Sequence, residues 1–540
     1  MNRPGCCGVS PLMHSLTRPL LALVFLLGLA PIAQAPAAQP ADTAPLERGA
    51  AIIDPLALRA LDAGRLGLGG MLRPDASVST PLASNELFAL PSMRGVRTAM
   101  DAEFERYIAH HKASLPNESI GVGPGFAFQL FDRATLDSPD TRFILSGIVN
   151  RMDRAYVDPA SCGEIRLVYR LTQTKAAEIG EASVTPRLPM TLNMVLKAKG
   201  EHDVDAKGAP LTCAEIARRW LATADINLTG VELADKLTEA GGALATVAPA
   251  NIVRIETNLQ IAHAPKSEAR DFRTDYLMKV FDYSATSNSF EEATLENQID
   301  RERLLADHDL QHEFKAWLLD PLNLIEFDRG TLLIPEKFLS KAAIAPTPTG
   351  LAASDMQPAF GLVAGEDGTD NPVFSEADVV GALKRAADQG ITLQNIRSVA
   401  GFERRLNDIT CAGCHQTRGI GGFHFPGVDW MAANPSNTIV VPASPHFFGD
   451  QVRRRDIIAA FAEGKPVDFS RGFASRPQSR GSTELAGTEY DDGWGAHCYV
   501  QHENTSENDA SFAAWGCAEG LACQAMSPAS RIGMCFVKPR

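Results

Sequence analysis

The amino-acid sequence predicts a multidomain chain, with an α+β domain on the N-terminal side, a mainly α domain after it, and a small disulfide-rich module at the C-terminal end. Three observations predict this division. The chain has 540 residues, which is more than one hydrophobic core usually serves. Strand-like and helix-like patterns are mixed up to about residue 345, whereas helical patterns dominate from there to about residue 475. Four cysteines then lie between residues 498 and 535.

The composition narrows the classes of function. Hydrophobic residues make up 45% of the chain and charged residues 21%, so there is enough apolar material for packed cores and global disorder is excluded. The chain has 51 Lys and Arg residues and 65 Asp and Glu residues, which gives a net charge of -14. An acidic chain argues against nucleic acid, or an anionic membrane surface, as the main partner.

Residues 1–35 have the pattern of a cleaved secretory signal peptide. Arg3 and Arg18 precede an apolar run over Leu20–Leu29, and an Ala-Gln-Ala sequence ending at Ala35 fits a cleavage site. The apolar run is too short to span a bilayer, and no second long run follows, so we expect no transmembrane anchor. We therefore expect an exported bacterial protein, periplasmic or secreted.

The α+β domain is expected over residues 100–345, after leader, linker and lead-in segments at residues 36–99 that open with an Ala- and Pro-rich stretch. Alternation of apolar and polar residues, or short apolar runs, predicts strands over residues 142–150, 163–169, 190–196, 252–261 and 275–283. Helical periodicity, with Thr212 as a cap, predicts helices over residues 212–222, 231–239 and 300–319. Strands gathered with inserted helices favour an α+β domain over a regular βαβ array.

Two features of this domain contain residue types that also occur in functional sites. His308 and His312 are spaced i, i+4 on a predicted helix, which can hold a metal, but an exposed helix face explains them better. Polar residues at 150–154 and 162–166 stand at predicted strand ends. They can form a site, although turn and salt-bridge roles are favoured.

Cys411, Cys414 and His415 form a C-x-x-C-H string, the attachment signature of a c-type haem. Positions i, i+3 and i+4 share one face of a helical turn, so two thiols can add to the haem vinyl groups while the imidazole reaches the iron. Chance predicts about 0.003 such strings in a chain of this composition. Covalent haem attachment in bacteria takes place outside the cytoplasm, which agrees with export. We expect one haem c, bound by Cys411 and Cys414, with His415 as an axial ligand.

Two other interpretations of the string stay open. The two cysteines can form a disulfide or redox pair, although the thioredoxin-like βαβ setting of redox pairs is not found nearby. They can also bind another metal such as zinc, although zinc would require a second ligand pair and the chain has no other C-x-x-C.

The surroundings of the string resemble small c-type cytochromes over about residues 375–470, and residues 346–475 are therefore assigned to a cytochrome-c-like haem domain. Helical patterns precede the string, a glycine-rich loop follows it, and a terminal helix closes the region. These elements are expected at residues 382–387, 396–406, 419–422 and 453–463. The resemblance implies a sixth iron ligand, for which His424, His446 and Met431 are the candidates. An open or water-bound sixth site is the alternative.

Residues 476–540 are expected to form a small disulfide-rich module. Its cysteines are Cys498, Cys517, Cys523 and Cys535. A segment this short cannot bury enough apolar surface alone, so two disulfides are expected to support it, with all three connectivities open. Modules of this kind mostly have a binding or capping role. In the α+β domain, Cys162 and Cys213 are the only cysteines and are expected to pair with each other.

A wider resemblance is carried by Ile148–Asp153, Cys162–Tyr169 and Thr410–His415. Together these segments resemble a group of uncharacterised exported bacterial proteins, over about residues 140–465. Those proteins also have an aromatic-flanked His soon after the string, which favours His424 as the sixth ligand. The resemblance implies no known activity.

The sequence thus predicts an exported c-type haem protein that transfers electrons through one covalently bound haem to a redox partner not identified by the sequence. One alternative is a haem enzyme or sensor, for example peroxidase-like, with an open distal site. Another is a secreted binding protein without redox activity, in which the cysteines only form disulfides. These alternatives do not decide whether the protein is an enzyme.

Overall fold

The computed structural model describes most of the chain between residues 49 and 537. The described ranges are 49–73, 81–174, 177–179, 182–184, 187–205, 207–264, 273–347, 373–412, 451–471, 497–501, 516–517, 521–525 and 532–537. The expected signal peptide at residues 1–35 lies outside them.

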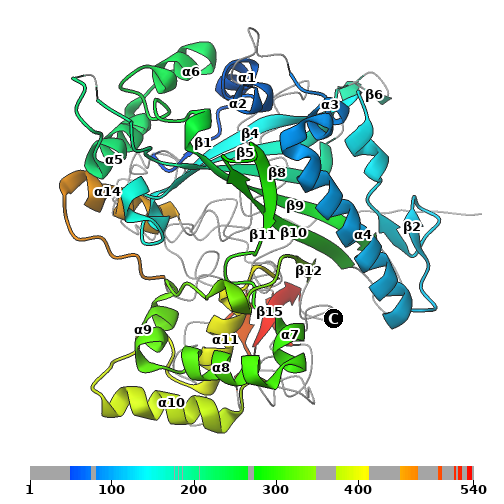
Figure 1. The fold of residues 1–540 in the computed structure, drawn as a ribbon, viewed down its shortest axis with the longest axis vertical. Helices are drawn as coiled ribbons and strands as arrows, with labels where there is room; N and C mark the ends of the chain where they lie inside the picture. Colours follow the sequence, from blue (N-terminus) through cyan, green and yellow to red (C-terminus); the bar gives the residue numbers. More distant parts are fainter. Residues whose placement is uncertain are drawn as a thin grey trace, which may run out of the picture. The chain divides into compact units, whose positions relative to one another are not determined.

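The main element is a large sheet (Figure 1), to which ten strands contribute in the described residues. Seven of them follow the order β1-β4-β5-β8-β9-β10-β11, while β12 pairs with β10, and β3 joins β2 to β9. All pairings are antiparallel except that of β2 with β3. The strands are β1 (Ala51–Ile52), β2 (Ile120–Val122), β3 (Phe128–Leu130), β4 (Thr141–Arg151), β5 (Glu164–Gln173), β8 (Arg187–Lys197), β9 (Ile252–Ala264), β10 (Arg273–Ser284), β11 (Ser289–Ala293) and β12 (Ala343–Thr347). A separate hairpin pairs β6 (Ala177–Ile179) with β7 (Ala182–Val184).

The five strands expected from the sequence are all present, as β4, β5, β8, β9 and β10. They form because apolar residues alternate along them, which buries one side of each strand. In β5, for example, Ile165, Leu167, Tyr169 and Leu171 belong to the main apolar core. We call their side of the sheet the apolar face.

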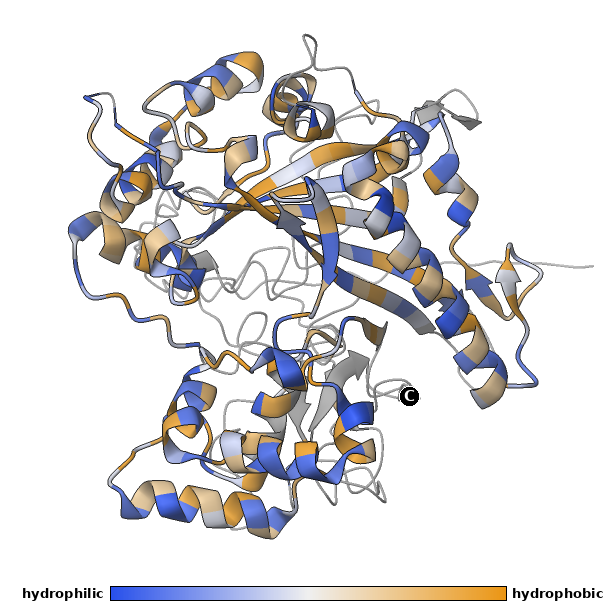
Figure 2. Cartoon of the chain, viewed as in Figure 1, coloured by the Kyte–Doolittle hydropathy of each residue, from blue (hydrophilic) through white to orange (hydrophobic). Residues whose placement is uncertain are grey.

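Helices cover the apolar face. They are α1 (Pro55–Ala63), α2 (Leu68–Leu72), α3 (Ser84–Ala89), α4 (Arg94–Ser114), α5 (Cys213–Ala222) and α6 (Gly230–Thr238). In α4 the buried residues Val96, Met100, Phe104 and Tyr107 recur at helical spacing, and Figure 2 shows hydrophobic and hydrophilic residues alternating along this helix. The two helices expected at residues 212–222 and 231–239 are α5 and α6, and Thr212 caps α5 by accepting from the backbone N–H of Glu215.

Residues 50–99 contribute to this core, whereas the sequence pattern assigns residues 36–99 to leader and lead-in segments. Ala50, Leu58, Met93 and Val96 are all buried in it. Helix α1 begins because Asp54 accepts a hydrogen bond from Ala57 N–H and is followed by proline at the first helical position.

A second apolar core is built from helices and lies between Ile299 and Leu406. Its helices are α7 (Arg301–Ala306), α8 (His308–Leu318), α9 (Pro321–Arg329), α10 (Glu376–Asp388) and α11 (Val399–Ile409). The sequence places the start of the mainly α domain at residue 346, but α7–α9 already share this core with α10 and α11. Phe314 joins the two groups, because its ring packs on both Phe338 and Phe374.

The helix expected over residues 300–319 is wrong as a continuous element. It divides at Asp307, whose extended backbone ends α7 and whose carboxylate caps α8 by accepting from the N–H groups of Asp309 and Leu310. A capping carboxylate offers the backbone an alternative to continuing the helix, and this competition is stronger here than the apolar periodicity across the break.

One buried carboxylate links α9 to the segment that leads into α11. Asp328 accepts hydrogen bonds from three consecutive backbone N–H groups, at 2.8 Å from Gln394, 2.8 Å from Asn395 and 2.6 Å from Ile396. Its own carbonyl oxygen accepts from Arg405 of α11 at 2.8 Å. The position of α11, and of Cys411 soon after it, therefore depends on Asp328.

Helix α14 (Gln451–Glu463) belongs to the main core and packs against α5. Ile458 is buried in that core, and Phe461 packs against it. This differs from the expected cytochrome-like domain, in which the terminal helix would close a domain begun at residue 346. Arg218 of α5 also donates to the carbonyl oxygen of Ala462.

The C-terminal segment has three short strands in the order β13-β15-β14. They are β13 (His497–Tyr499), β14 (Leu521–Ala525) and β15 (Ile532–Val537). Cys517 and Cys523 are disulfide-bonded, and the register places Cys523 opposite Cys535. None of the helices in the described ranges combines the length and the apolarity needed to cross a bilayer.

Candidate functional site

The face of the sheet opposite the apolar face has polar side chains that are buried or half-buried. We call it the polar face and define it by Glu164, Arg166, Arg170, Thr191, Asn193, Arg254, Glu256, Asn258 and Tyr276. Successive side chains on a strand point to opposite faces, so these residues alternate with the apolar ones of β5, β8, β9 and β10. Buried polar groups on a sheet are costly unless they find partners, which makes this face the most informative surface of the chain.

The strand register places these residues in rows across the sheet. One row runs from Met278 on β10 through Asn258 on β9 and Thr191 on β8 to Arg170 on β5. The neighbouring row contains Asn193 between Glu256 of β9 and Val168 of β5.

Four residues of the polar face form a closed set of ion pairs. Arg166 donates to Glu164 at 2.9 Å and to Glu256 at 2.8 Å. Arg254 reaches the same two carboxylates, Glu164 at 2.8 Å and Glu256 at 2.9 Å. Each arginine thus bridges strands β5 and β9 across β8, and the set is held on one side of the sheet.

The ion pairs continue into the short helix η3 (Met152–Arg154) that follows β4. Arg151 donates to Asp153 at 2.8 Å, and Arg453 of α14 donates to the same carboxylate at 2.9 Å. Arg154 lies 3.4 Å from Glu164 and also pairs with Glu296. Charged residues at 150–154 and 162–166 therefore do form salt bridges, as the sequence favoured. Arg154 joins the set that contains Glu164, whereas Arg151, Asp153 and Arg453 form a second set next to it in the chain.

The arginines keep two of these carboxylates, those of Asp153 and Glu164, ionised. Burial alone would raise the pKa of Asp153, but the charges of Arg151, Arg454 and Arg453 outweigh it and hold the pKa far below its ordinary value. In the same way burial would raise the pKa of Glu164, and the charges of Arg254, Arg154 and Arg166 hold it well below the usual range.

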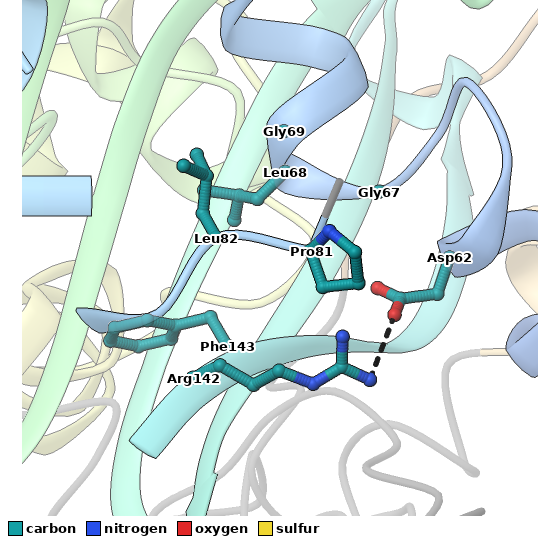
Figure 3. A pocket seen from close by; sticks show the side chains of 8 residues that line it. All are labelled: Asp62, Gly67, Leu68, Gly69, Pro81, Leu82, Arg142 and Phe143. Atoms are coloured by element: carbon teal, nitrogen blue, oxygen red, sulfur yellow. Dashed lines mark ion pairs between the residues drawn. The ribbon is translucent and has the colours of Figure 1, made fainter. Parts of the chain in front are cut away.

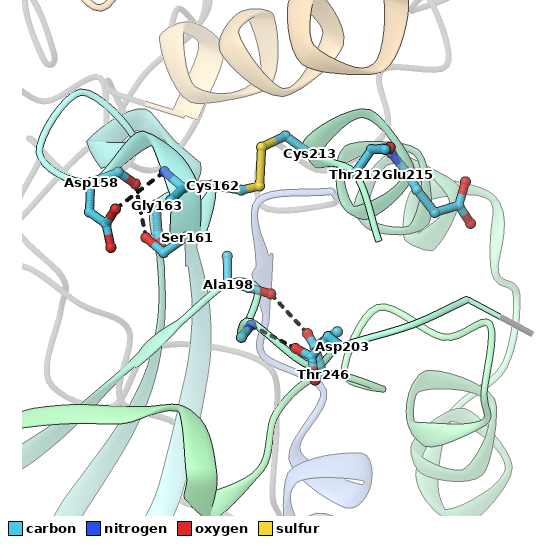
Figure 4. The surroundings of a disulfide bond; sticks show 12 residues. Asp158, Ser161, Cys162, Gly163, Ala198, Asp203, Thr212, Cys213, Glu215 and Thr246 are labelled. Atoms are coloured by element: carbon cyan, nitrogen blue, oxygen red, sulfur yellow. Dashed lines mark hydrogen bonds between the residues drawn. A yellow bond between two sulfur atoms is a disulfide. The ribbon is translucent and has the colours of Figure 1, made fainter. Parts of the chain in front are cut away.

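A disulfide and a glycine shape the chain at the start of β5. Cys162 pairs with Cys213 of α5 (Figure 4), which is the pairing expected from the sequence. Gly163 has a φ of +89°, and a Cβ there would lie 2.7 Å from the carbonyl oxygen of Arg151. Only glycine suits this close approach, so Gly163 lets Glu164 enter the network directly after the disulfide.

The cysteine string begins beside the polar face. Cys411 and Ala412 follow α11 and pack in a small apolar cluster with Met278 and Val280 of β10 and Ala345 of β12. Met278 and Val280 alternate with the apolar-face residues of β10, so they share the side of the polar face.

Residues just after β11 connect the string to the ion-pair network. The Cys411 thiol donates to the carbonyl oxygen of Glu296 at 3.6 Å, and the Ala412 N–H donates to the Gln298 side chain at 3.0 Å. The carboxylate of Glu296 pairs with Arg154. Sequence reasoning missed this convergence, because no local pattern connects residues 151–166, 296–298 and 411.

Several predicted site residues lie outside the described residues. They are Cys414, His415, His424, Met431 and His446. His308 and His312 are described, and neither is buried on α8. Among the residues whose positions are described, no group of three or more His, Cys, Asp or Glu side chains is arranged to hold a metal ion.

A small pocket lies elsewhere, next to α1 and the start of β4. It is lined by Asp62, Gly67, Leu68, Gly69, Pro81, Leu82, Arg142 and Phe143, as Figure 3 shows. Asp62 and Arg142 form an ion pair of 3.4 Å across it, and Asp62 also accepts from the Leu145 N–H at 2.9 Å. These contacts join α1 to β4, so the pocket is explained by packing.

The polar face brings guanidinium, carboxylate and carboxamide groups together on the side of the sheet where the apolar cluster with Cys411 also packs. Asn193 is 6% exposed, and its Oδ1 finds no hydrogen-bond partner among the described residues. A buried polar atom in that condition points to a partner that the polypeptide does not supply.

Comparison with protein-family models, curated proteins and solved structures finds no match to this chain.

Proposed function

We propose that this chain is an exported c-type haem protein that transfers electrons through one haem. The observation that carries the proposal is the C-x-x-C-H string over Cys411, Cys414 and His415, because its residue types and spacing match covalent haem attachment. When bound, the haem supplies a one-electron redox centre. Export through a signal peptide at residues 1–35 belongs to the same proposal, since the attachment takes place outside the cytoplasm.

The residues have separate roles in this proposal. Cys411 and Cys414 form the two thioether bonds, and His415 is the axial iron ligand. His424 is favoured as the sixth ligand, with His446 and Met431 as the other candidates. The C-terminal module over residues 476–540 then has a binding or capping role, and the redox partner is a separate protein.

The position of Cys411 supports the proposal. Cys411 has an intermediate level of exposure and contacts the carbonyl oxygen of Glu296. Glu296 and Gln298 hold the start of the string against the sheet, and a fixed attachment point orients a redox group rigidly. Rigid placement suits electron transfer, because little has to reorganise when the charge changes.

One observation favours a second candidate function. The polar face beside the string contains buried arginine and asparagine side chains, and polar hydrogen-bonding groups on the distal side of a haem favour ligand activation over pure electron transfer. A haem enzyme or sensor with an open sixth site is therefore the alternative. A low-spin, six-coordinate spectrum that carbon monoxide leaves unchanged supports electron transfer, whereas high-spin iron that binds carbon monoxide or peroxide supports the alternative.

The test is haem attachment itself. The full chain is exported in a bacterial host that expresses cytochrome maturation proteins, and a denaturing gel is stained for haem. We expect a stained band for the wild type and none for the Cys411→Ala/Cys414→Ala variant. The Cys162→Ala/Cys213→Ala variant is the matched control, since it loses two cysteines without touching the string. A wild-type protein without haem, with Cys411 and Cys414 in a mutual disulfide, would overturn the proposal in favour of a binding protein.

A further inference from the structure

An irregular segment leaves helix α14 and reaches the helical core. We call its residues, 464–471, the strap, and Figure 1 shows them as the orange coil that leaves α14 and runs toward α9. Helix α14 ends because Gly464 has a φ of +66° and donates its N–H to the carbonyl oxygen of Phe461 at 3.1 Å. Residues 465–471 are neither helix nor strand. The strap therefore starts on an element of the main core.

The strap contacts the main core through Phe469. The centre of its ring lies 5.7 Å from that of Tyr156 and 6.1 Å from that of Phe461. Tyr156 lies just after η3 in the chain, and Phe461 of α14 packs against the main core. Phe469 is half-buried, and aromatic pairs of this kind stabilise a structure beyond the area that they bury. Its ring thus joins the strap to two elements of the main core.

The last residues of the strap contact the helical core. Arg471 N–H donates to the carbonyl oxygen of Arg329 at 2.7 Å, and Arg329 Nε donates to Ser470 Oγ at 3.1 Å. Arg329 is the last residue of α9, where the carbonyl groups have no partner within the helix. The strap therefore supplies a hydrogen bond that the end of α9 requires.

Arg405 of α11 connects the strap to α9. Its Nη2 donates to the carbonyl oxygen of Arg471 at 2.8 Å and to that of Asp328 at 2.8 Å. Arg405 is 2% exposed, so the loss of such a bond leaves a buried group that water does not easily reach. A Cβ on Gly330 would lie 3.3 Å from Arg471, which shows how closely the strap packs here. The strap thus lies against the ends of both helices.

The two contact points of the strap are close together in the chain. Phe469 and Arg471 are two residues apart, and an extended chain spans at most about 3.6 Å per residue, so their Cα atoms are at most about 7 Å apart. There is little slack between them. Movement of Phe469 away from Tyr156 therefore pulls on the hydrogen bonds of Arg471.

We propose that the strap is a conformational coupling device, in which the packing of Phe469 on the main core holds α11 in place through Arg471 and Arg405. Undocking of α14 then loosens α11. Since coupling between two sites is reciprocal, loosening of α11 also weakens the docking of α14. The inference concerns the polypeptide alone, so it does not depend on a bound cofactor.

The test is hydrogen exchange of the full-length protein, measured by mass spectrometry in peptides from α11. Phe469→Ala removes the ring contacts and leaves in place the groups that form the hydrogen bonds of Arg405. We expect α11 to exchange about tenfold faster, because two aromatic pairs of ordinary strength are lost. Peptides from α14 should show a similar increase, whereas peptides from β5 should exchange at the wild-type rate.

Two glycines inserted after Phe469 test the coupling directly. The insertion adds up to about 7 Å of chain and keeps the side chains on both sides of it. We expect Phe469→Ala to change the exchange of α11 less than about twofold in this background, because the added chain absorbs the movement.

Phe88→Ala is the matched control. Phe88 also forms an aromatic pair in the main core, with Phe143 at 6.2 Å, but it belongs to α3. We expect its loss to leave the exchange of α11 within about twofold of the wild type, since local opening is confined to the affected elements.

Three results would overturn the inference. In the first, Phe469→Ala speeds exchange in α14 and leaves α11 at the wild-type rate. In the second, Phe88→Ala speeds α11 as much as Phe469→Ala does. In the third, the effect of Phe469→Ala on α11 persists at full size in the insertion background. If Phe469→Ala does not accumulate, Phe469→Leu replaces it; about threefold faster exchange in α11 supports the coupling, and wild-type exchange overturns it.

Discussion

Replacing Asp328 by alanine would release the segment that leads into α11. The carboxylate is 2% exposed and accepts three backbone N–H groups. Of the three donor residues, Ile396 is buried and the other two, Gln394 and Asn395, are not. A buried N–H that loses its partner costs about 2 kcal/mol, whereas an N–H that regains water costs about 0.5 kcal/mol. The expected loss is therefore about 3 kcal/mol for local opening of this segment.

Hydrogen exchange measured by mass spectrometry checks this value, because it reports opening element by element. A loss of about 3 kcal/mol predicts amide exchange about 100-fold faster in peptides that cover α11, since each 1.4 kcal/mol is a factor of ten. Peptides from β5 are expected to exchange at the wild-type rate. Asp328→Asn keeps the shape of the side chain and one carbonyl oxygen, so we expect about half of the loss in free energy that Asp328→Ala causes.

Asp320→Ala is the control for this experiment. Asp320 caps α9 in the same helical core, but it accepts from one backbone N–H, that of Leu322 at 2.9 Å. The loss of such a cap costs about 1 kcal/mol. If α11 exchanges no faster in Asp328→Ala than in Asp320→Ala, the carboxylate does not hold α11 and the reasoning is refuted.

Three further predictions concern stability. Because the disulfide joins residues 51 positions apart, the Cys162→Ser/Cys213→Ser variant should lose about 4 kcal/mol of unfolding free energy in urea titrations, and a loss below about 1 kcal/mol would contradict this. Since the folded-state pKa of Glu164 lies below its ordinary value, its contribution is present above about pH 4.5 and decreases as the pH falls; the wild type should lose stability between about pH 5 and 3 more steeply than Glu164→Gln, and parallel curves would count against the network. The His308→Ala/His312→Ala variant should change stability by less than about 0.5 kcal/mol and leave haem staining unchanged, because neither side chain is buried; a loss of staining would reveal a ligand role.

Sequence reasoning located the long strands well because their apolar residues alternate. In β5 the alternation of Ile165, Leu167 and Tyr169 with polar residues is enough to indicate a half-buried strand. It failed where a short-range signal competes with periodicity, as at Asp307, which looks like part of one long helix and instead caps a second one. It also passed over α1, although Asp54 followed by Pro55 is a recognised helix start.

Sequence reasoning could identify only part of the candidate site. The cysteine string is local and can be recognised from its spacing. The ion pairs beside it are not local, because Glu164, Glu256 and Glu296 come from distant parts of the chain and are joined only by arginines of the folded sheet region. Polar residues on a strand normally indicate a solvated face. The sequence pattern therefore did not predict that the polar residues of β5, β8 and β9 are buried.

The order of elements along the chain has a consequence for biosynthesis. The last strand of the main sheet, β12, ends at Thr347, well before Cys411, while α14 returns afterwards to pack on α5. A chain that is synthesised from its N-terminus can assemble its early part first. The sheet is therefore available as a scaffold when the cysteines arrive, and the return of α14 comes after them. The haem attachment proposed above would fall in the interval between these two events, and a variant that delays the packing of α14 would lengthen that interval.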